Sequence, residues 1–338
     1  MNTYYIGADV HCNKTELAVE RKNKIIQRFS VPTTIPAISE VLKSIPGRKH
    51  LTFEEGPMAG WLYRNLTDKV DTITVCDPRR NKLIASDGDK DDKIDAAKLA
   101  CLLRGKYLRS VYHGTDDKIV ELKRWVRLYL DRVKQATACI NKIRSQARMY
   151  GIKIPRRALK DVQYRQKWLC SLSKESVAKR LQILWIGYDA SAQQTKLSRQ
   201  QMSKLAGGYP IIRYWDRLPG VGPIRATTIF AYLETPWRFK KKNKLWKYCG
   251  VGLVRQFSGG GAGRLKMNWS SNKRLKNAVM GAAISAIRHR DNIFRDDYER
   301  MVKDGITPSN ARHAVARKLL TVMWGMWKNI SRFDKSLC

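Results

Sequence analysis

The sequence of 338 residues predicts a mixed α/β domain at the N-terminus, a long helical region in the middle and a mostly helical region at the C-terminus. Three observations predict this order: short strand-like runs split by polar turns, then a sustained heptad pattern, then helical segments punctuated by glycine. With 43% hydrophobic residues, the chain can bury substantial cores. We place the domains at residues 1–112, 113–206 and 207–338.

The N-terminal domain opens with three strand-like runs, as in an antiparallel meander, and then alternates helices with strands. This order of elements is that of a ribonuclease-H-like α/β sheet, and composition equally allows other mixed α/β folds. The predicted strands cover residues 3–10, 15–20, 24–31, 50–54 and 71–76, and the predicted helices lie near 35–45, 57–68, 78–85 and 92–105.

The charge of the chain is large and unevenly distributed. The net charge is +37 at pH 7. Residues 1–100 hold 16 basic and 14 acidic side chains, whereas residues 101–338 hold the other 50 basic and 15 acidic ones. A body this basic indicates a nucleic acid as partner, because cations neutralise phosphates and release counterions. An anionic membrane surface is the alternative, but no amphipathic anchor stands out and no segment is apolar enough to cross a bilayer.

The seven cysteines are scattered along the chain without a CxxC pair. This spacing favours reduced thiols in a cytoplasmic protein over a disulfide framework or a zinc site. The five histidines show no metal-ligand spacing either. Carboxylates are therefore the expected ligands of any metal, and oxygen ligands favour Mg²⁺ or Mn²⁺ over Zn²⁺.

Four carboxylates of the first hundred residues stand at positions suited to a metal site. Asp9 lies in the apolar run 6–10, and Glu54 closes the apolar strand at 50–54 in the same way. A charged side chain in such a strand is costly unless it is paired or binds a metal. Asp92 and Asp95 are three residues apart at a predicted helix start, so both lie on one helix face. Together these acids can hold two metal ions that polarise a phosphate.

Each acid also has an ordinary structural interpretation. Asp9 is also suited to forming a turn, and Glu54 competes with its neighbour Glu55. Asp92 and Asp95 are also typical of acids that stabilise a helix N-terminus.

The middle region carries a heptad pattern over residues 119–150, which predicts a coiled-coil hairpin or dimer. The alternative is a long helix packed on its own domain. A second helical stretch covers about 161–205, with a weaker seam through Val177, Leu181, Leu184 and Tyr188. The first seam consists of Ile119, Leu122, Val126, Tyr129, Val133, Ala136, Ile140, Ile143, Ala147 and Tyr150.

The C-terminal region contains a serine in a glycine-rich loop. Ser258 precedes three glycines, and Arg264 and Lys266 follow the loop. Glycines allow the backbone to approach a phosphate closely, and cations stabilise the charge that develops when a serine hydroxyl attacks. A serine in such a loop is also an ordinary turn residue. Upstream, the turn at 218–223 (LPGVGP) is expected to point backbone N–H groups at a phosphate.

Basic and aromatic residues are interleaved just before this loop. The cations can contact phosphates, and Trp237, Phe239 and Trp246 can stack on unpaired bases. A solvated basic helix with a packed aromatic edge is the alternative interpretation. We interpret the late acidic cluster around Asp297 as surface salt bridges. The expected nucleic-acid contacts are Arg238, Lys240, Lys241, Lys242, Lys244, Arg264, Lys266, Lys273 and Arg274.

Several motifs occur in a fixed order along the chain. They are Ile6–Asp9, the run EEGPMAGWL at 54–62, the run KDDKIDA at 90–96, the run LPGVGP at 218–223, Gly250, and FSGG at 257–260. In this order they resemble the DEDD transposases of the IS110 family of insertion sequences. The resemblance covers most of the chain. It implies a RuvC-like N-terminal domain and a C-terminal transposase domain.

The resemblance also implies site residues. Asp9, Glu54, Asp92 and Asp95 correspond to the DEDD ligands of Mg²⁺ or Mn²⁺, with Glu54 preferred over Glu55 because the family pattern is Glu-x-Gly-Pro. Ser258 corresponds to a serine that attacks DNA and forms a covalent phosphoserine. Ser270 and Ser271 are the fallback nucleophiles, because Val254 and Phe257 stand near places where the family often has proline and an acid.

The function that we expect is therefore that of a DNA recombinase which mobilises an insertion sequence. The resemblance implies donor and target double-stranded DNA, a structured noncoding guide RNA, and a homo-oligomer, either dimer or tetramer, with a site shared between protomers as one hypothesis. Two other functions remain open: a RuvC-like junction nuclease that uses water, and a basic nucleic-acid-binding protein without catalysis.

Overall fold

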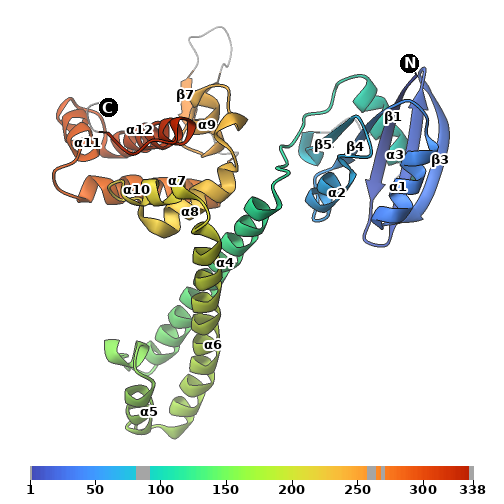
Figure 1. Ribbon diagram of the computed structural model, residues 1–338. Coiled ribbons are helices and arrows are strands. Elements are labelled where there is room, and N and C mark those ends of the chain that lie inside the picture. Colours follow the sequence, from blue (N-terminus) through green and yellow to red (C-terminus); the bar gives the residue numbers. More distant parts are fainter. Residues whose placement is uncertain (1, 81–91, 257–263, 268–270, 335–338) are drawn as a thin grey trace. The chain divides into compact units, whose positions relative to one another are not determined.

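The computed structural model describes residues 2–80, 92–256, 264–267 and 271–334. The chain forms two compact units, residues 1–115 and 116–338, which we describe separately (Figure 1). No helix of the described part is long and apolar enough to cross a membrane.

The first unit contains a five-stranded sheet with the order β3-β2-β1-β4-β5. Strands β1, β2 and β3 form an antiparallel meander, whereas β1, β4 and β5 run parallel. The predicted mixed α/β sheet is confirmed, with each strand within two residues of its expected bounds. The strands are β1 (Thr3–Val10), β2 (Lys14–Arg21), β3 (Lys24–Pro32), β4 (Arg48–Glu54) and β5 (Thr72–Cys76).

Helices cover both faces of this sheet. Strand residues alternate between faces, so Ile6 and Ala8 of β1 face one side, and Gly7 and Asp9 face the other. Helices α1 and α2 bury apolar side chains in the same core as Ile6 and Ala8, whereas α3 packs against Gly7. Of the helix expected at 78–85, the described residues 78–80 form one short 3-10 turn. The helices are α1 (Ile35–Ser44), α2 (Ala59–Leu66) and α3 (Asp92–Arg104).

Gly7 allows α3 to approach β1 more closely than any other residue would permit. A Cβ atom at this position would lie 2.1 Å from the carbonyl oxygen of Ala96 and 2.5 Å from the backbone nitrogen of Ala100. Both are backbone atoms, so no side-chain movement could relieve the overlap. This close approach determines the distance between α3 and the sheet.

The direction of α3 follows from a contact at its other end. Arg104, the last residue of α3, forms an ion pair with the buried Glu20 of β2. Glu20 lies opposite Tyr5 in the register of β1, two residues before Gly7. Because the end of α3 lies beside the earlier part of β1, its beginning lies towards Asp9.

The second unit begins with two long helices that run side by side, α4 (Asp117–Arg148) and α6 (Glu175–Ala206) (Figure 1). The predicted heptad stretch is helical, but its apolar seam is divided between two cores of the same chain. Leu122 and Val126 pack against the C-terminal helices, whereas Ile143 packs against Leu181 of α6. The structure thus shows a packed pair of helices, and the predicted coiled coil is not confirmed.

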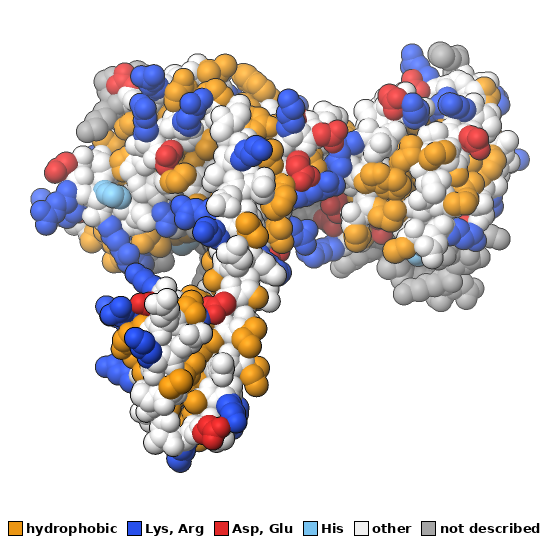
Figure 2. Space-filling model, turned by 60° about the horizontal axis from the view of Figure 1, so that its bottom comes forward, with side chains coloured by type: hydrophobic (Ala, Val, Ile, Leu, Met, Phe, Trp, Pro, Cys, Tyr) orange, Lys and Arg blue, Asp and Glu red, His pale blue; other side chains and the backbone are white. Residues whose placement is uncertain are grey.

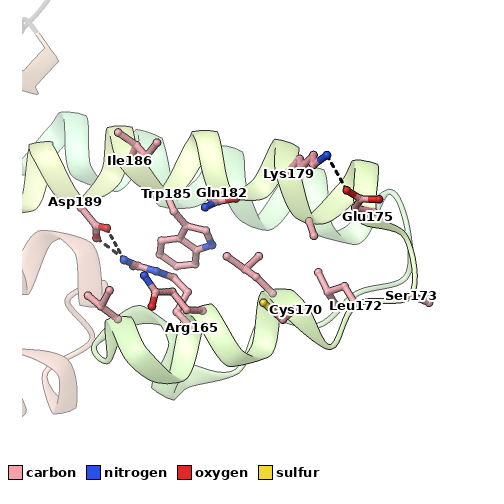
Figure 3. Close-up of a pocket in the computed structure, with 14 residues that line it drawn as sticks. Arg165, Cys170, Leu172, Ser173, Glu175, Lys179, Gln182, Trp185, Ile186 and Asp189 are labelled. Carbon is pink, nitrogen blue, oxygen red and sulfur yellow. Dashed lines mark hydrogen bonds and ion pairs between the residues drawn. The ribbon is translucent and has the colours of Figure 1, made fainter.

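The far end of this pair is closed by α5 (Val162–Cys170). Arg165 of α5 is 4% exposed, lies 4.4 Å from the ring centre of Trp185 and forms a two-point ion pair with Asp189 (Figure 3). These contacts lie beside a cavity of about 660 Å³ between α5 and α6. The weaker seam predicted for α6 did not include Trp185, which is 2% exposed and belongs to this core.

The rest of the second unit is mostly helical, as predicted, with one short unexpected hairpin of β6 and β7. The predicted turn at 218–223 joins α7 to α8, and its Gly220 packs against α10, where a Cβ would lie 2.2 Å from the backbone nitrogen of Ala286. The elements are α7 (Pro210–Asp216), α8 (Gly222–Leu233), α9 (Lys242–Tyr248), β6 (Leu253–Gln256), β7 (Arg264–Met267), α10 (Lys273–Arg288), α11 (Ile293–Lys303) and α12 (Pro308–Asn329).

We predict that Gly7→Ala lowers the free energy of unfolding of the first unit by about 1–3 kcal/mol or more, because the new methyl group overlaps the backbone of α3. Chemical denaturation followed by circular dichroism measures this change. Gly187→Ala in α6 is the control, because its Cβ would meet open space, and we expect it to be neutral or stabilising by about 0.5–1 kcal/mol. Equal stability of Gly7→Ala and the natural protein would contradict the close packing.

Candidate functional site

Two of the four predicted carboxylates lie side by side at one edge of the sheet. The parallel register of β1 and β4 pairs Ala8 with Phe53, so Asp9 and Glu54 are the next residues of two neighbouring strands. Neighbouring strands lie about 4.8 Å apart, and residues at matching positions face the same side. Both carboxylates therefore project from the face that α3 covers. The side chain of Asp9 is 23% exposed, so this edge is open to solvent.

The beginning of α3 reaches the same edge. Ala96 and Ala100 lie over Gly7, and Asp9 lies two residues further along β1, about 6.6 Å at the usual rise of a strand. Asp95 directly precedes Ala96 in the helix, and one helical turn back from Ala96, about 5.4 Å along the axis, leads to the first residue of α3. Asp95 is half-buried. Asp92 is the first residue of α3, and its side chain lies outside the described part of the structure.

Glu55 is oriented differently from Glu54. Its carboxylate accepts a hydrogen bond from Nε2 of His113 at 2.6 Å, and its backbone N–H donates to the carbonyl of Cys76. Adjacent strand residues point to opposite faces, so Glu55 turns away from the side that Asp9 occupies. Register thus provides the distinction between these two acids that sequence alone left open.

Two residues beside Asp9 were missed by the sequence reasoning. His11 places Nε2 3.1 Å from Oδ2 of Asp9, and Glu16 lies directly opposite Asp9 on β2. Glu16 is 4% exposed and is held by Lys14 at 2.6 Å and by the hydroxyl of Ser30 at 2.9 Å. The sequence signal that could have identified both residues is the predicted hairpin, because a tight turn after Asp9 brings the start of the next strand back beside it.

The donor set of this edge suits a hard divalent cation. Asp9, Glu54 and Asp95 offer carboxylate oxygens, which Mg²⁺ and Mn²⁺ prefer over nitrogen or sulfur. Within the described residues, no group of three or more His, Cys, Asp or Glu side chains is arranged closely enough to hold a metal ion. The side chain of the fourth predicted ligand, Asp92, lies outside the described part of the structure.

The predicted serine lies outside the described residues, within 257–263. The strands before and after it, β6 and β7, pair antiparallel, with Gln256 opposite Arg264. Of the two fallback serines, Ser270 also lies outside the described part. Ser271 packs against Gly250, where a Cβ would lie 2.5 Å from the serine hydroxyl.

The residues predicted to contact nucleic acid differ in whether they form contacts within the protein or are exposed to solvent. Arg238 donates to the carbonyl of Tyr232 and stacks on Tyr248, with 4.2 Å from its guanidinium to the ring centre. Arg274 donates to Asp131 at 2.8 Å, and this hydrogen bond raises the pKa of Arg274. Lys240, Lys241, Lys242, Lys244 and Lys273 are exposed, whereas the side chains of Arg264 and Lys266 lie outside the described part.

Lys and Arg side chains are spread over much of the surface of the second unit (Figure 2). The predicted salt bridges of its acidic cluster are confirmed in part: Asp297 pairs with Arg300 and Lys318, and Glu299 pairs with Arg295. Several acids of this unit are thus paired with neighbouring cations, and exposed lysines on the same unit are suited to an anionic partner.

Comparison with protein families gives two matches, which together span more than half of the chain. Residues 6–151 match a transposase family model of the DEDD type from IS110 elements, and residues 213–299 match the model described as "Transposase IS116/IS110/IS902 family". The chain belongs to the IS110 family of transposases. A search of curated proteins found no match.

Membership of this family gives the protein the activity of a DNA transposase or recombinase. The first match begins in β1 and ends just after α4, so it contains Asp9, Glu54, Asp92 and Asp95. The second runs from α7 to α11 and contains Ser258 and the lysine-rich segment. The acids and the serine of this transposase are therefore carried by its two separately matched regions.

We predict that Glu54→Gln weakens Mn²⁺ binding to the transposase by at least about tenfold, because it removes a charged ligand at the sheet edge. Isothermal titration of the full chain with MnCl₂ measures this loss. Glu55→Gln is the matched control, because Glu55 already binds His113, and we expect its affinity for Mn²⁺ to stay within about twofold of the natural protein. Equal losses in both variants, or a larger loss in Glu55→Gln, would contradict the assignment from register.

Proposed function

We propose that this transposase cuts and rejoins DNA through a covalent serine–DNA intermediate. Ser258 is the nucleophile. Asp9, Glu54, Asp92 and Asp95 hold two divalent cations, Mg²⁺ or Mn²⁺, which, when bound, supply the Lewis acidity that a phosphodiester reaction requires. The observation that carries the proposal is the parallel register of β1 and β4, which brings Asp9 and Glu54 together on the face covered by the acid-bearing helix α3.

The chemical step divides between the two regions. The hydroxyl oxygen of Ser258 forms a bond to phosphorus, the bond from phosphorus to one deoxyribose oxygen breaks, and that oxygen leaves with a proton as a free hydroxyl group. Rejoining is the reverse reaction with the hydroxyl end of another strand, which releases the serine. The phosphodiester energy is conserved in the serine ester, so strand transfer needs no external energy source.

The basic second unit supplies the surface for the nucleic acids. Its exposed lysines contact phosphates of donor and target DNA, and the excess of cations in residues 101–338 is sufficient for a structured guide RNA as well. We propose that such an RNA selects the DNA sites and that the protein acts as a homo-oligomer. The support for RNA guidance is the family membership together with this charge.

A RuvC-like nuclease that uses water is the competing function for the same carboxylates. It needs the acids of the first unit and has no use for Ser258. A binding protein without catalysis needs neither. The two enzymatic functions therefore differ in whether DNA becomes attached to the protein.

We predict a protein–DNA adduct when the transposase is incubated with labelled element-junction DNA, its cognate RNA and Mg²⁺ and is then resolved on a denaturing gel. Ser258→Ala abolishes the adduct because the attacking oxygen is gone. Asp9→Asn reduces its rate at least about hundredfold, since metal ions contribute several kcal/mol to such steps.

Ser271→Ala is the matched control and keeps the adduct, because Ser271 packs against Gly250. Cleaved DNA without an adduct in the natural protein would contradict the serine intermediate and favour the nuclease. An adduct that persists in Ser258→Ala and disappears in Ser271→Ala would show that Ser271 is the nucleophile and that Ser258 is not.

A further inference from the structure

A cavity of about 510 Å³ opens on the second unit, and none of the residues that line it is assigned to catalysis. Its walls come from segments far apart in sequence: the start of α7, the end of α8, the short 3-10 helix of residues 236–238 and the end of α12. Tyr209, Phe230, Trp327 and Trp237 give it a largely aromatic lining. A cavity of this size with few polar groups has the properties of a site for a small, flat ligand.

Trp237 is the most exposed aromatic residue of this lining. Its side chain is 70% exposed, and Nζ of Lys328 lies 5.2 Å from its ring centre. Two hydrogen bonds hold the backbone at this position. The indole N–H of Trp324 donates to the carbonyl of Pro236 at 2.7 Å, and the hydroxyl of Thr235 accepts from the backbone N–H of Trp237. An exposed aromatic ring held in place beside a cation is suited to stacking on a nucleobase.

Tyr209 lines the cavity and carries a buried hydroxyl group. Its ring packs against Phe230, with 4.6 Å between ring centres, and burial raises its pKa, so the hydroxyl stays protonated at neutral pH. Within the described residues this buried hydroxyl has no hydrogen-bond partner. Buried polar groups normally have partners, so a ligand with a polar edge is the expected occupant.

The charge around the cavity identifies the chemistry of that ligand. The one acid of the lining that is deeply buried, Glu234, is neutralised by Lys123 at 2.6 Å. The exposed Lys240, Lys241 and Lys242 follow directly after Trp237 along the chain. A flat ring carried by a polyanion matches the positive charge of this surface.

We propose that this cavity receives one unpaired base of the DNA strand, stacked on Trp237 with its polar edge towards the hydroxyl of Tyr209. The proposal goes beyond the serine chemistry and rests only on DNA as the substrate of the family. A protein that captures a base in this way holds DNA strands apart next to its phosphate-binding lysines, which favours the exchange of one strand for another.

The test uses the full-length protein and single-stranded DNA oligonucleotides that each carry one 2-aminopurine, in EDTA so that no cleavage occurs. Stacking on Trp237 quenches the fluorescence of 2-aminopurine. We expect Trp237→Ala to abolish the quenching and to weaken binding about 5- to 150-fold, the loss typical for one stacked base. Trp237→Phe keeps most of the affinity, and Tyr209→Phe keeps the quenching but changes the preference among bases.

Tyr150→Ala is the matched control. Tyr150 is also exposed and has Arg180 and Lys174 over its ring, but it lines no part of this cavity, so we expect unchanged quenching. Unfolding curves show whether each variant keeps its fold.

Quenching and affinity that survive in a folded Trp237→Ala would overturn the proposal. So would a quenching effect with RNA of the same sequence and none with DNA, or a change in oligomeric state as the sole effect of the substitution. Because EDTA removes the metal and Ser258→Ala can serve as the background, failure here is distinct from failure of the serine mechanism.

Discussion

The packing of α3 against β1 at Gly7 is the constraint on which the proposed catalytic edge depends. A side chain at that position would strike the backbone of Ala96, so the helix could not lie where it does. The ion pair between Arg104 and Glu20 sets the direction of α3 and places its acid-bearing start over the edge where β1 and β4 end. The edge thus combines acids from two strands and a helix, which are more than forty residues apart in sequence.

The second unit carries most of the positive charge of the chain. Several of its acids are paired with neighbouring cations, as at Asp297 and Asp131, and the predicted phosphate contacts Lys240, Lys241, Lys242, Lys244 and Lys273 are exposed. This separation has a physical reason. Carboxylates that bind cations lose affinity for them among many lysines, and lysines that bind phosphates lose strength beside carboxylates. Because the two units differ in charge, one chain can carry both the proposed cation-binding carboxylates and the proposed phosphate-binding lysines.

Much of this arrangement was predictable from the sequence, and the rest depended on contacts that periodicity does not reveal. The strands followed from alternation and turn residues. The family pattern preferred Glu54 over Glu55, and the register of the sheet, which only the fold shows, adds that Glu54 follows the β4 partner of Asp9's neighbour and faces the same side as Asp9. The heptad pattern identified the apolar face of α4 but not its partners, because Leu122 and Ile143 belong to different cores. The sequence predicts Arg238 as a phosphate contact, and the structure adds that the carbonyl of Tyr232 and the ring of Tyr248 contact it. No local sequence pattern predicts these partners.

The measurement that tests the central claim most directly is iron-mediated cleavage of the full-length protein. Fe²⁺ that occupies a site for Mg²⁺ reduces added hydrogen peroxide to hydroxide and a hydroxyl radical and becomes Fe³⁺. The radicals cut the nearest backbone segments, and the fragments are identified by mass spectrometry. The account predicts cuts around residues 9, 54 and 92–95 in the same sample, suppressed by excess Mg²⁺ and lost together in Asp9→Asn. Cuts confined to the acidic cluster near Asp297, or cuts at one of the three segments alone, would contradict a shared metal site at the edge of the sheet.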